Sequence, residues 1–168
     1  MTPHETLHAL EAHRRALIAR LDGLSTEAVA AHPPGGGWSL AQIVEHLARI
    51  DAGLRLGAPM AGAVVRATSG ARCRILRGVL GLPLRIPAPP GAQGVMPSEA
   101  PDYGAVREAW AERRADWSRR LPEADPAAVA FRHPLMGPFL LPDALAFLLA
   151  HHRHHDAQVE RTLAQVTR

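Results

Sequence analysis

Apolar side chains recur at steps of three and four residues between positions 40 and 54, and this spacing limits the fold more than any other feature of the chain. The positions are Leu40, Ile43, Leu47, Ile50 and Leu54. Because an α-helix turns once in 3.6 residues, these steps place the apolar side chains on one face. Ser39, followed three residues later by Gln42, has the spacing of a capping box and marks the start of this helix. A helix of this kind packs against other helices.

Three further segments show the same period. Thr2 to about Asp22, Asp102 to Leu121, and Pro142 to about Val166 each place apolar residues along one side and polar residues along the other. Pro142 suits the first turn of the last helix, where its missing amide hydrogen costs no helical hydrogen bond. No strand pair is indicated beyond a short extended piece around Phe131 to Leu141. The sequence therefore predicts an all-α fold, a four-helix bundle with a long crossover between helices two and three.

The crossover spans residues 55 to 101, where glycine and proline are frequent. Enough apolar residues remain for a short helix around Ala71 to Leu80. Pro87 to Gly91 is expected to be extended or loop, because proline lacks the amide hydrogen and restricts the residue before it. At 168 residues the chain is long enough for one core, so we expect a single domain over residues 1–168.

Composition indicates which metal ligands, which compartment and which partners to expect. The single cysteine, Cys73, rules out an internal disulfide, and any metal is held mainly by histidine and carboxylate. The chain starts without an apolar leader and has no run of about 18 apolar residues, so we expect a cytoplasmic protein with no membrane contact. The pI of 10.3 reflects an all-arginine set of basic residues, whereas the formal net charge is only +3. We therefore expect a small-molecule substrate and no nucleic acid.

Four histidines crowd into the segment 151–155, inside the last predicted helix. At about 100° per residue, His151 and His155 project within roughly 40° of each other and can aim at one point. Spacing alone does not select this pair, since His151 with His154, and His152 with His155, are three residues apart. Two imidazoles on adjacent turns make half of a metal site, and a third ligand is needed to hold the ion.

His46 is the other histidine set in a strongly periodic helix, beside the stripe of Ile43 and Ile50. Helices two and four can therefore bring three imidazoles to one corner of the bundle. Neutral imidazole suits Zn, Ni, Fe, Mn or Cu, and the sequence does not rank these metals. A competing interpretation is that the histidines are hydrogen-bonded residues of the core or its edge, or that the cluster is a purification tag. Tags, however, are usually uninterrupted and lie outside a core-forming helix.

Two motifs resemble those of the DinB-like superfamily. The first is the stretch from Gly37 to Leu47, in which a Trp-Ser pair precedes a helix with one histidine, and the second is H-x-x-x-H-x-x-Q from His151 to Gln158. The segment from His133 to Gly137 resembles the approach to the last helix. This resemblance spans most of the chain. It implies a four-helix bundle with one divalent metal ion (Zn, Ni, Mn or Fe), and it selects the ligands that spacing leaves open, namely His46, His151 and His155.

The resemblance also implies a class of activity. The superfamily includes thiol S-transferases that use bacillithiol or mycothiol, a relative described as a metal-dependent maleylpyruvate isomerase, and proteins first described as metal-dependent hydrolases. Three histidine ligands leave an open position on the ion, which is typical of a catalytic site. A thiol at that position becomes a thiolate, and a water becomes hydroxide. We therefore expect a thiol S-transferase; the alternatives are a metal-dependent hydrolase and a non-catalytic protein that binds a metal or small ligand.

Four polar residues are close enough in sequence to orient the imidazoles, namely Gln158, Asp156, Glu45 and Asp51. Gln158 ranks first because it shares a side of its helix with His151. For Glu45 and Asp156 a position on a solvated helix surface is the favoured interpretation.

Between Ala52 and Ser98 the chain carries six arginines and no acidic residue. They are Arg55, Arg66, Arg72, Arg74, Arg77 and Arg85. Such a segment can attract anions as a lid over the site, but a solvated loop or a helix packed on a partner subunit, as in a homodimer, is the favoured interpretation. Cys73 lies among these arginines, whose charge favours the thiolate, but no base is identified beside it.

Overall fold

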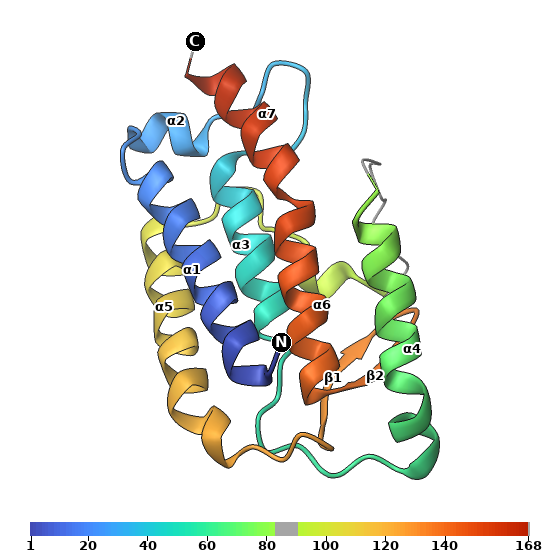
Figure 1. Ribbon diagram of the computed structural model, residues 1–168. Helices are drawn as coiled ribbons and strands as arrows, with labels where there is room; N and C mark the ends of the chain where they lie inside the picture. Colours follow the sequence, from blue (N-terminus) through green and yellow to red (C-terminus); the bar gives the residue numbers. More distant parts are fainter. Residues whose placement is uncertain (83–90, 168) are drawn as a thin grey trace.

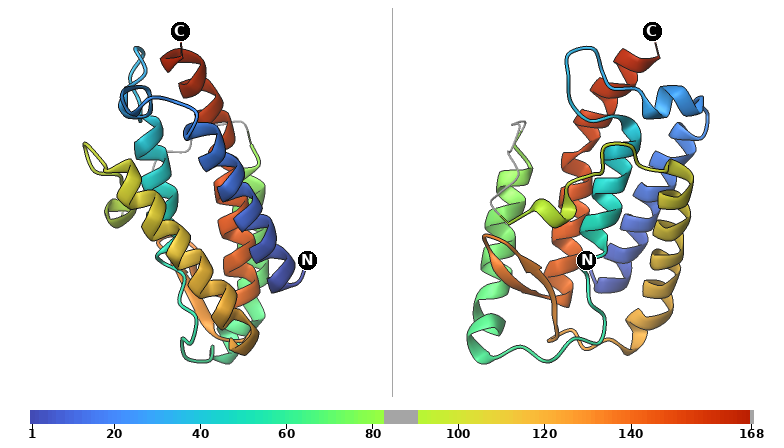
Figure 2. Two further views of the ribbon diagram at one scale, coloured as in Figure 1. Left: turned by 90° about the vertical axis from the view of Figure 1, so that its left-hand side faces the viewer. Right: turned by 180° about the vertical axis from the view of Figure 1, so that it is seen from behind.

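The computed structural model describes residues 1–82 and 91–167, and most of these residues are helical (Figure 1). The helices α1 (Pro3–Leu21), α3 (Leu40–Asp51), α5 (Tyr103–Arg120) and α6 (Leu141–His154), which α7 (Asp156–Val166) continues, lie side by side in Figures 1 and 2. Each begins within one or two residues of its predicted start. Within the described part of the chain, no helix combines the length and apolar character that crossing a membrane requires.

Capping boxes begin two of these helices. The hydroxyl of Thr2 accepts from the amide of Glu5 at 3.2 Å, and the carboxylate of Glu5 accepts from the amide of Thr2 at 2.8 Å. The predicted box at Ser39 and Gln42 forms in the same way, with distances of 3.2 and 3.0 Å. These bonds satisfy amide groups that have no partner inside the helix, and so they define where each helix starts.

The α3 helix is enclosed by the rest of the molecule. Every residue of α3 except Arg49 is buried, including the polar Gln42, Glu45 and Asp51. Except for Ile50, its apolar residues form one core with α1, α2 (Thr26–Ala30) and Trp110 of α5. The apolar stripe indicated one packed face, but α3 is covered on all sides. Its polar side chains therefore need partners from other elements.

The crossover contains a longer helix than the one predicted around Ala71 to Leu80. The observed α4 spans Ala63–Leu80 and packs against α6 and the hairpin. Ser69 anchors its first half, because its hydroxyl donates to Asp143 of α6 and accepts from the amide of Leu140. Such tertiary contacts outweigh the low helix propensity of the glycines within the helix. The predicted extended stretch Pro87–Pro90 lies outside the described residues, and Gly91 adopts a φ of +88°.

A hairpin precedes the last helix, where the sequence indicates one extended piece. The strands β1 (Val129–His133) and β2 (Gly137–Leu140) pair antiparallel, with Phe131 opposite Phe139. Two short 3-10 helices, η1 (Gln93–Val95) and η2 (Leu121–Glu123), and the short helix α2 are elements that the apolar period does not indicate.

The predicted helix from Pro142 to Val166 is divided at His155 into α6 and α7. At this point the amide of His155 bonds to the carbonyl of His152 at 3.1 Å, and the amide of Gln158 bonds to that of His155 at 3.0 Å. These bonds join residues three apart, which is the tighter 3-10 pattern. The second of the two C-terminal histidines proposed as ligands therefore occupies the junction between two helices.

Candidate metal centre

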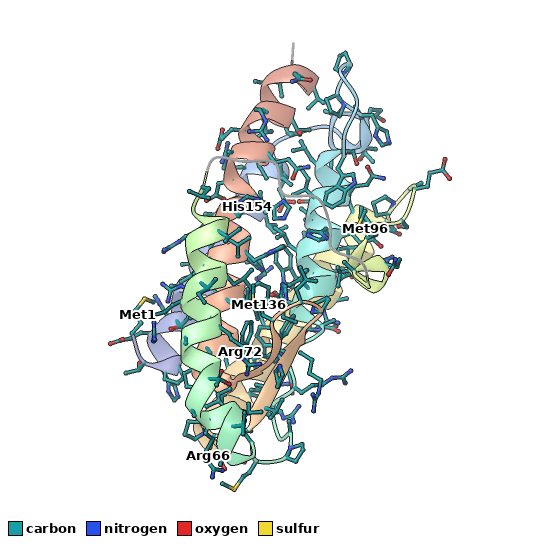
Figure 3. The ribbon with its side chains drawn as sticks, turned by 90° about the vertical axis from the view of Figure 1, so that its right-hand side faces the viewer. Met1, Arg66, Arg72, Met96, Met136 and His154 are labelled. Atoms are coloured by element: carbon teal, nitrogen blue, oxygen red, sulfur yellow. The ribbon has the colours of Figure 1, made fainter. Side chains whose placement is uncertain are left out.

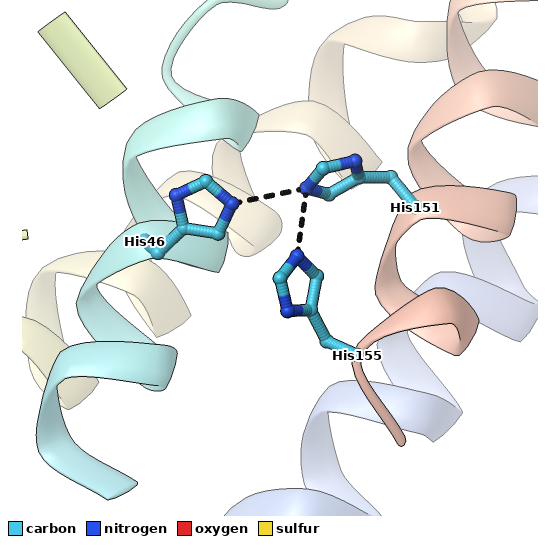
Figure 4. A group of neighbouring side chains, drawn as sticks. All are labelled: His46, His151 and His155. Atoms are coloured by element: carbon cyan, nitrogen blue, oxygen red, sulfur yellow. Dashed lines mark hydrogen bonds between the residues drawn. The ribbon is translucent and has the colours of Figure 1, made fainter. Parts of the chain in front are cut away.

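Three histidines meet between α3 and the last helix pair (Figure 4). The Nε2 atom of His151 lies 3.1 Å from Nε2 of His46 and 3.2 Å from Nε2 of His155. One ring nitrogen from each residue lies within 4.8 Å of those of the other two. The structure thus brings together the three residues that the resemblance selects.

The other ring nitrogen of two of these histidines is held by a polar partner. Nδ1 of His46 donates to the carbonyl oxygen of Val95 at 2.8 Å, and Nδ1 of His155 donates to the side-chain oxygen of Gln158 at 2.8 Å. A neutral imidazole that donates from Nδ1 carries a lone pair on Nε2. Both rings therefore present lone pairs to the centre of the cluster.

Hydrogen bonds among the three facing Nε2 atoms cannot account for both short contacts. His151 has one hydrogen at most on Nε2 and can donate it to one neighbour, so a second contact joins two lone pairs. A shared cation removes that conflict. Two imidazole nitrogens that each lie about 2.0–2.1 Å from one zinc ion, at angles of about 90–110°, are about 2.9–3.4 Å apart. The contacts of 3.1 and 3.2 Å fall in that range.

Burial keeps the three imidazoles in the neutral form that binds metals. Desolvation lowers the pKa of His46, and the bond to Val95 opposes this shift only in part. Desolvation also lowers the pKa of His151 well below its usual value, and nearby histidines lower it further. The pKa of His155 falls to about 4, mainly through burial. Neutral imidazoles leave their lone pairs available for a cation.

Trp38, from the motif before α3, covers the cluster on one side. Its ring centroid lies 4.8 Å from that of His46, and it stacks on His155 at 6.3 Å with an angle of 14° between the rings. In the sequence, Trp38 was only one residue of a motif. The structure shows that its ring packs against His46 and His155. An aromatic wall restricts the rotation of both imidazoles and shields them from water.

A clamp on α3 holds the chain segment that orients His46. The carboxylate of Glu45 accepts from the amide and the hydroxyl of Ser98, and Gln42 donates to the carbonyl oxygen of Ser98. Arg49 donates to the carbonyl of Met96 and to Glu45. The clamp thereby positions the segment that contains the acceptor for His46. Glu45 is 8% exposed, so its predicted place on a solvated surface is wrong.

Of the other predicted orienting residues, Gln158 contacts one of the three converging histidines, while the remaining two have other partners. Asp51 is buried and binds His152 at 3.0 Å, Arg114 at 2.6 Å, and Trp110. Asp156 is exposed, as predicted, and accepts from His13 of α1 at 2.8 Å. Both belong to the packing of α6 and α7 against α1, α3 and α5.

The remaining C-terminal histidines are also engaged elsewhere. His152 is fully buried and bound to Asp51, and Nδ1 of His154 donates to the carbonyl of Leu80 at 2.8 Å. The group of converging ring nitrogens therefore contains His151 with His155, and neither His152 nor His154 belongs to it. His133 is not part of the cluster either, because its Nδ1 accepts from two amides of the hairpin loop.

The three histidines line a cavity of about 1460 Å³ between α3, α4, the hairpin and the α6–α7 pair. Figure 3 looks toward this side of the molecule, with Met96, Met136 and His154, which also line the cavity, labelled around it. A cavity of this size exceeds the usual range for one drug-sized ligand. The three imidazoles therefore lie in the wall of a cavity that is large enough for a small molecule.

Cys73 does not reach this chemistry. It is 2% exposed, it is absent from the cavity lining, and its sulfur donates to the carbonyl of Asp143 at 3.2 Å. Burial and the charge of Asp143 raise its pKa to about 11, so the charge of the neighbouring arginines does not produce a thiolate.

Fold and site together define a mostly helical protein with three converging imidazoles at the wall of a large cavity. Comparison with models of protein families gives one match. The model of the DinB superfamily matches residues 9–159, and the chain therefore belongs to the DinB superfamily. The matched range contains all three histidines. Comparisons with curated proteins and with solved structures gave no match.

Proposed function

We propose that this protein binds one divalent metal ion through His46, His151 and His155 and transfers a low-molecular-weight thiol, such as bacillithiol or mycothiol, to an electrophile. The observation that carries the proposal is the convergence of three Nε2 atoms, with contacts of 3.1 and 3.2 Å, on a large cavity. In this proposal α1, α3, α5 and the α6–α7 pair are the four helices of the bundle, and α4 belongs to the crossover.

A bound divalent ion would supply positive charge that favours thiolate over thiol at neutral pH. The chain supplies the rest. Val95 and Gln158 fix the tautomers of His46 and His155, so that Nε2 of each ring is the ligand atom. The volume of the cavity leaves room for a thiol and an electrophile together, which raises their effective concentration.

The reaction that we propose is a nucleophilic substitution in which the sulfur of the thiol is the nucleophile. The thiol loses its proton to solvent, its sulfur forms a bond to the electrophilic carbon, and the leaving group departs with the electron pair of the broken bond. The chain needs no oxidant or reductant for this step, in keeping with a buried Cys73 that plays no part.

The test is a conjugation assay with protein loaded with Zn²⁺, Ni²⁺ or Mn²⁺, with bacillithiol, mycothiol and glutathione offered to 1-chloro-2,4-dinitrobenzene. We expect product formation with at least one thiol, loss of that activity in His151→Ala, and its retention in the control His8→Ala, which replaces an exposed histidine of α1 outside the cavity. Absence of conjugation with all three thiols in protein shown to contain the metal would overturn the transferase proposal while leaving metal binding standing.

A further inference from the structure

Five arginines line the cavity from several sides. They are Arg74 and Arg77 on α4, Arg132 on β1, Arg153 on α6 and Arg161 on α7. All five are exposed, and none of their guanidinium groups forms an ion pair or hydrogen bond with any residue that the structure describes. Positive charges from separate elements therefore surround this cavity.

Among the residues that the structure describes, none of those lining this cavity is acidic. The nearby carboxylates are directed elsewhere by other partners. On α7, Asp156 binds His13 and Glu160 binds Arg20, both on α1. On α6, Asp143 accepts from Ser69 of α4. The charge of the cavity is therefore one-signed, and a cavity with walls of low dielectric concentrates that field.

The inner wall of the cavity is apolar. Leu76 and Leu80 of α4, Phe131 of β1 and Phe147 of α6 are all buried, and all line the cavity. The ring of Phe147 lies 5.6 Å from that of His151. Buried apolar residues next to the histidines and exposed arginines toward solvent give the cavity two chemically different parts.

We propose that this cavity binds an organic anion with an apolar body, such as an aromatic or aliphatic carboxylate. The anionic group lies among the arginines, and the apolar body lies against the leucine and phenylalanine side chains next to the histidines. The proposal rests on the proposed function in treating the three histidines as the reacting end, and it deepens that function by giving the substrate a charge. It does not need the metal for binding of the anion.

The test uses two fluorescent probes that share one aromatic body and differ by a sulfonate group. These are 8-anilinonaphthalene-1-sulfonate, an anion, and N-phenyl-1-naphthylamine, its neutral counterpart. Each is titrated into the full-length protein after chelation and again after Zn²⁺ loading. Because the two probes share one apolar body, the ratio of their dissociation constants isolates the contribution of the negative charge.

Arginine variants test whether the contribution of the negative charge comes from the cavity. The cavity variant carries Arg77→Gln, Arg132→Gln and Arg161→Gln, one each from α4, β1 and α7. The control carries Arg15→Gln, Arg55→Gln and Arg119→Gln, which are exposed and outside the cavity. Each exposed charge contact contributes roughly two- to fivefold, so the cavity variant should weaken the anionic probe by about tenfold or more. The control, with the same loss of charge, should weaken it by less than about threefold, because distant exposed charges are screened.

In the wild-type protein we expect the anionic probe to bind at least about tenfold more tightly than the neutral one, with or without zinc. The neutral probe should bind the cavity variant and the wild type equally. Equal affinity of the two probes, absence of any binding of the anion, or equal weakening in both triple variants would overturn the proposal. A zinc titration of the same preparations reports on the metal site separately, so failure of one proposal is distinguishable from failure of the other.

Discussion

At the scale of single residues, the site depends on which nitrogen of each imidazole is already occupied. The oxygen atoms of Val95 and Gln158 accept hydrogen bonds from Nδ1 of His46 and His155. The Nε2 lone pairs of these two rings therefore face His151. The spacing of H-x-x-x-H-x-x-Q was enough to predict Gln158 near the site, because helix geometry fixes what lies one turn away. Val95 was not predictable, because a backbone carbonyl from a distant loop leaves no mark on the sequence.

Replacing the amide that holds His155 should weaken the metal site without removing a ligand. We expect Gln158→Leu to raise the dissociation constant for Zn²⁺ about 10- to 100-fold, because the imidazole loses the acceptor that fixes its tautomer. A competition titration with a chromogenic chelator measures this change. Gln158→Glu keeps an acceptor and should restore most of the affinity, and Gln165→Leu, on the same helix, should have no effect. Unchanged affinity in Gln158→Leu would contradict an orienting role.

The thiol of Cys73 should be nearly inert in the folded protein. Its pKa of about 11 leaves a very small fraction of thiolate at pH 8, and its burial blocks access of reagents. We expect Ellman's reagent to modify Cys73 at least about 100-fold more slowly in the native protein than in 6 M guanidinium chloride. Rapid, complete modification of the native protein would show that the cysteine is accessible.

At the scale of elements, a buried carboxylate joins three of the long helices. Asp51, at the end of α3, accepts from Trp110 and Arg114 of α5 and from His152 of α6. The charge of Arg114 and the bonds of His152 and Trp110 overcome the effect of burial and lower the pKa of Asp51 to about 2. Unfolding releases these partners, so the folding equilibrium depends on the protonation of this group.

The stability of the fold should therefore decrease at acid pH in a way that Asp51 partly determines. A carboxyl whose folded pKa lies below its unfolded value of 3.8 contributes stability above pH 4, and this contribution is lost as the pH falls toward 2. The difference corresponds to about 2 kcal/mol. Urea unfolding at several pH values measures it.

Comparison with a variant assigns this loss to Asp51. We expect Asp51→Asn to lower the free energy of unfolding at pH 7 by about 3–5 kcal/mol, because Arg114 then stays buried without its counter-charge. The gap between variant and wild type should narrow below pH 4. Asp116→Asn, which removes a partly exposed carboxylate on α5, should change stability by less than about 1 kcal/mol. A constant gap at all pH values would contradict the assigned pKa.

Element boundaries show where local patterns suffice. Capping residues such as Thr2 and Ser39 marked helix starts because their hydrogen bonds join residues three apart. The early start of α4 at Ala63 was missed, because contacts of Ser69 with α6 and the hairpin stabilise it and lie about 70 residues away in sequence. The division at His155 was also missed, since a continuous apolar period does not report a change in hydrogen-bond spacing.

At the scale of the whole molecule, the site exists because two distant helices and one loop converge. His46 on α3 and His151 on α6 are 105 residues apart in sequence, and the segment from Val95 to Glu99 is held across α3 by Gln42, Glu45 and Arg49. The class of fold followed from four periodic segments. The choice of His46, His151 and His155 as the proposed ligands followed from the resemblance to a family, because periodicity left several histidine pairs equivalent.

The most direct test of this account is the metal content of the purified protein and its histidine variants, measured by mass spectrometry of the metals after incubation with Zn²⁺ and removal of the excess. We predict about one equivalent of metal in the wild type and in His154→Ala, whose ring binds the carbonyl of Leu80 instead. We predict loss of the ion from His46→Ala, His151→Ala and His155→Ala, with the helical signal in circular dichroism unchanged. Retention of a full equivalent in any of these three variants would contradict a centre built on all three imidazoles.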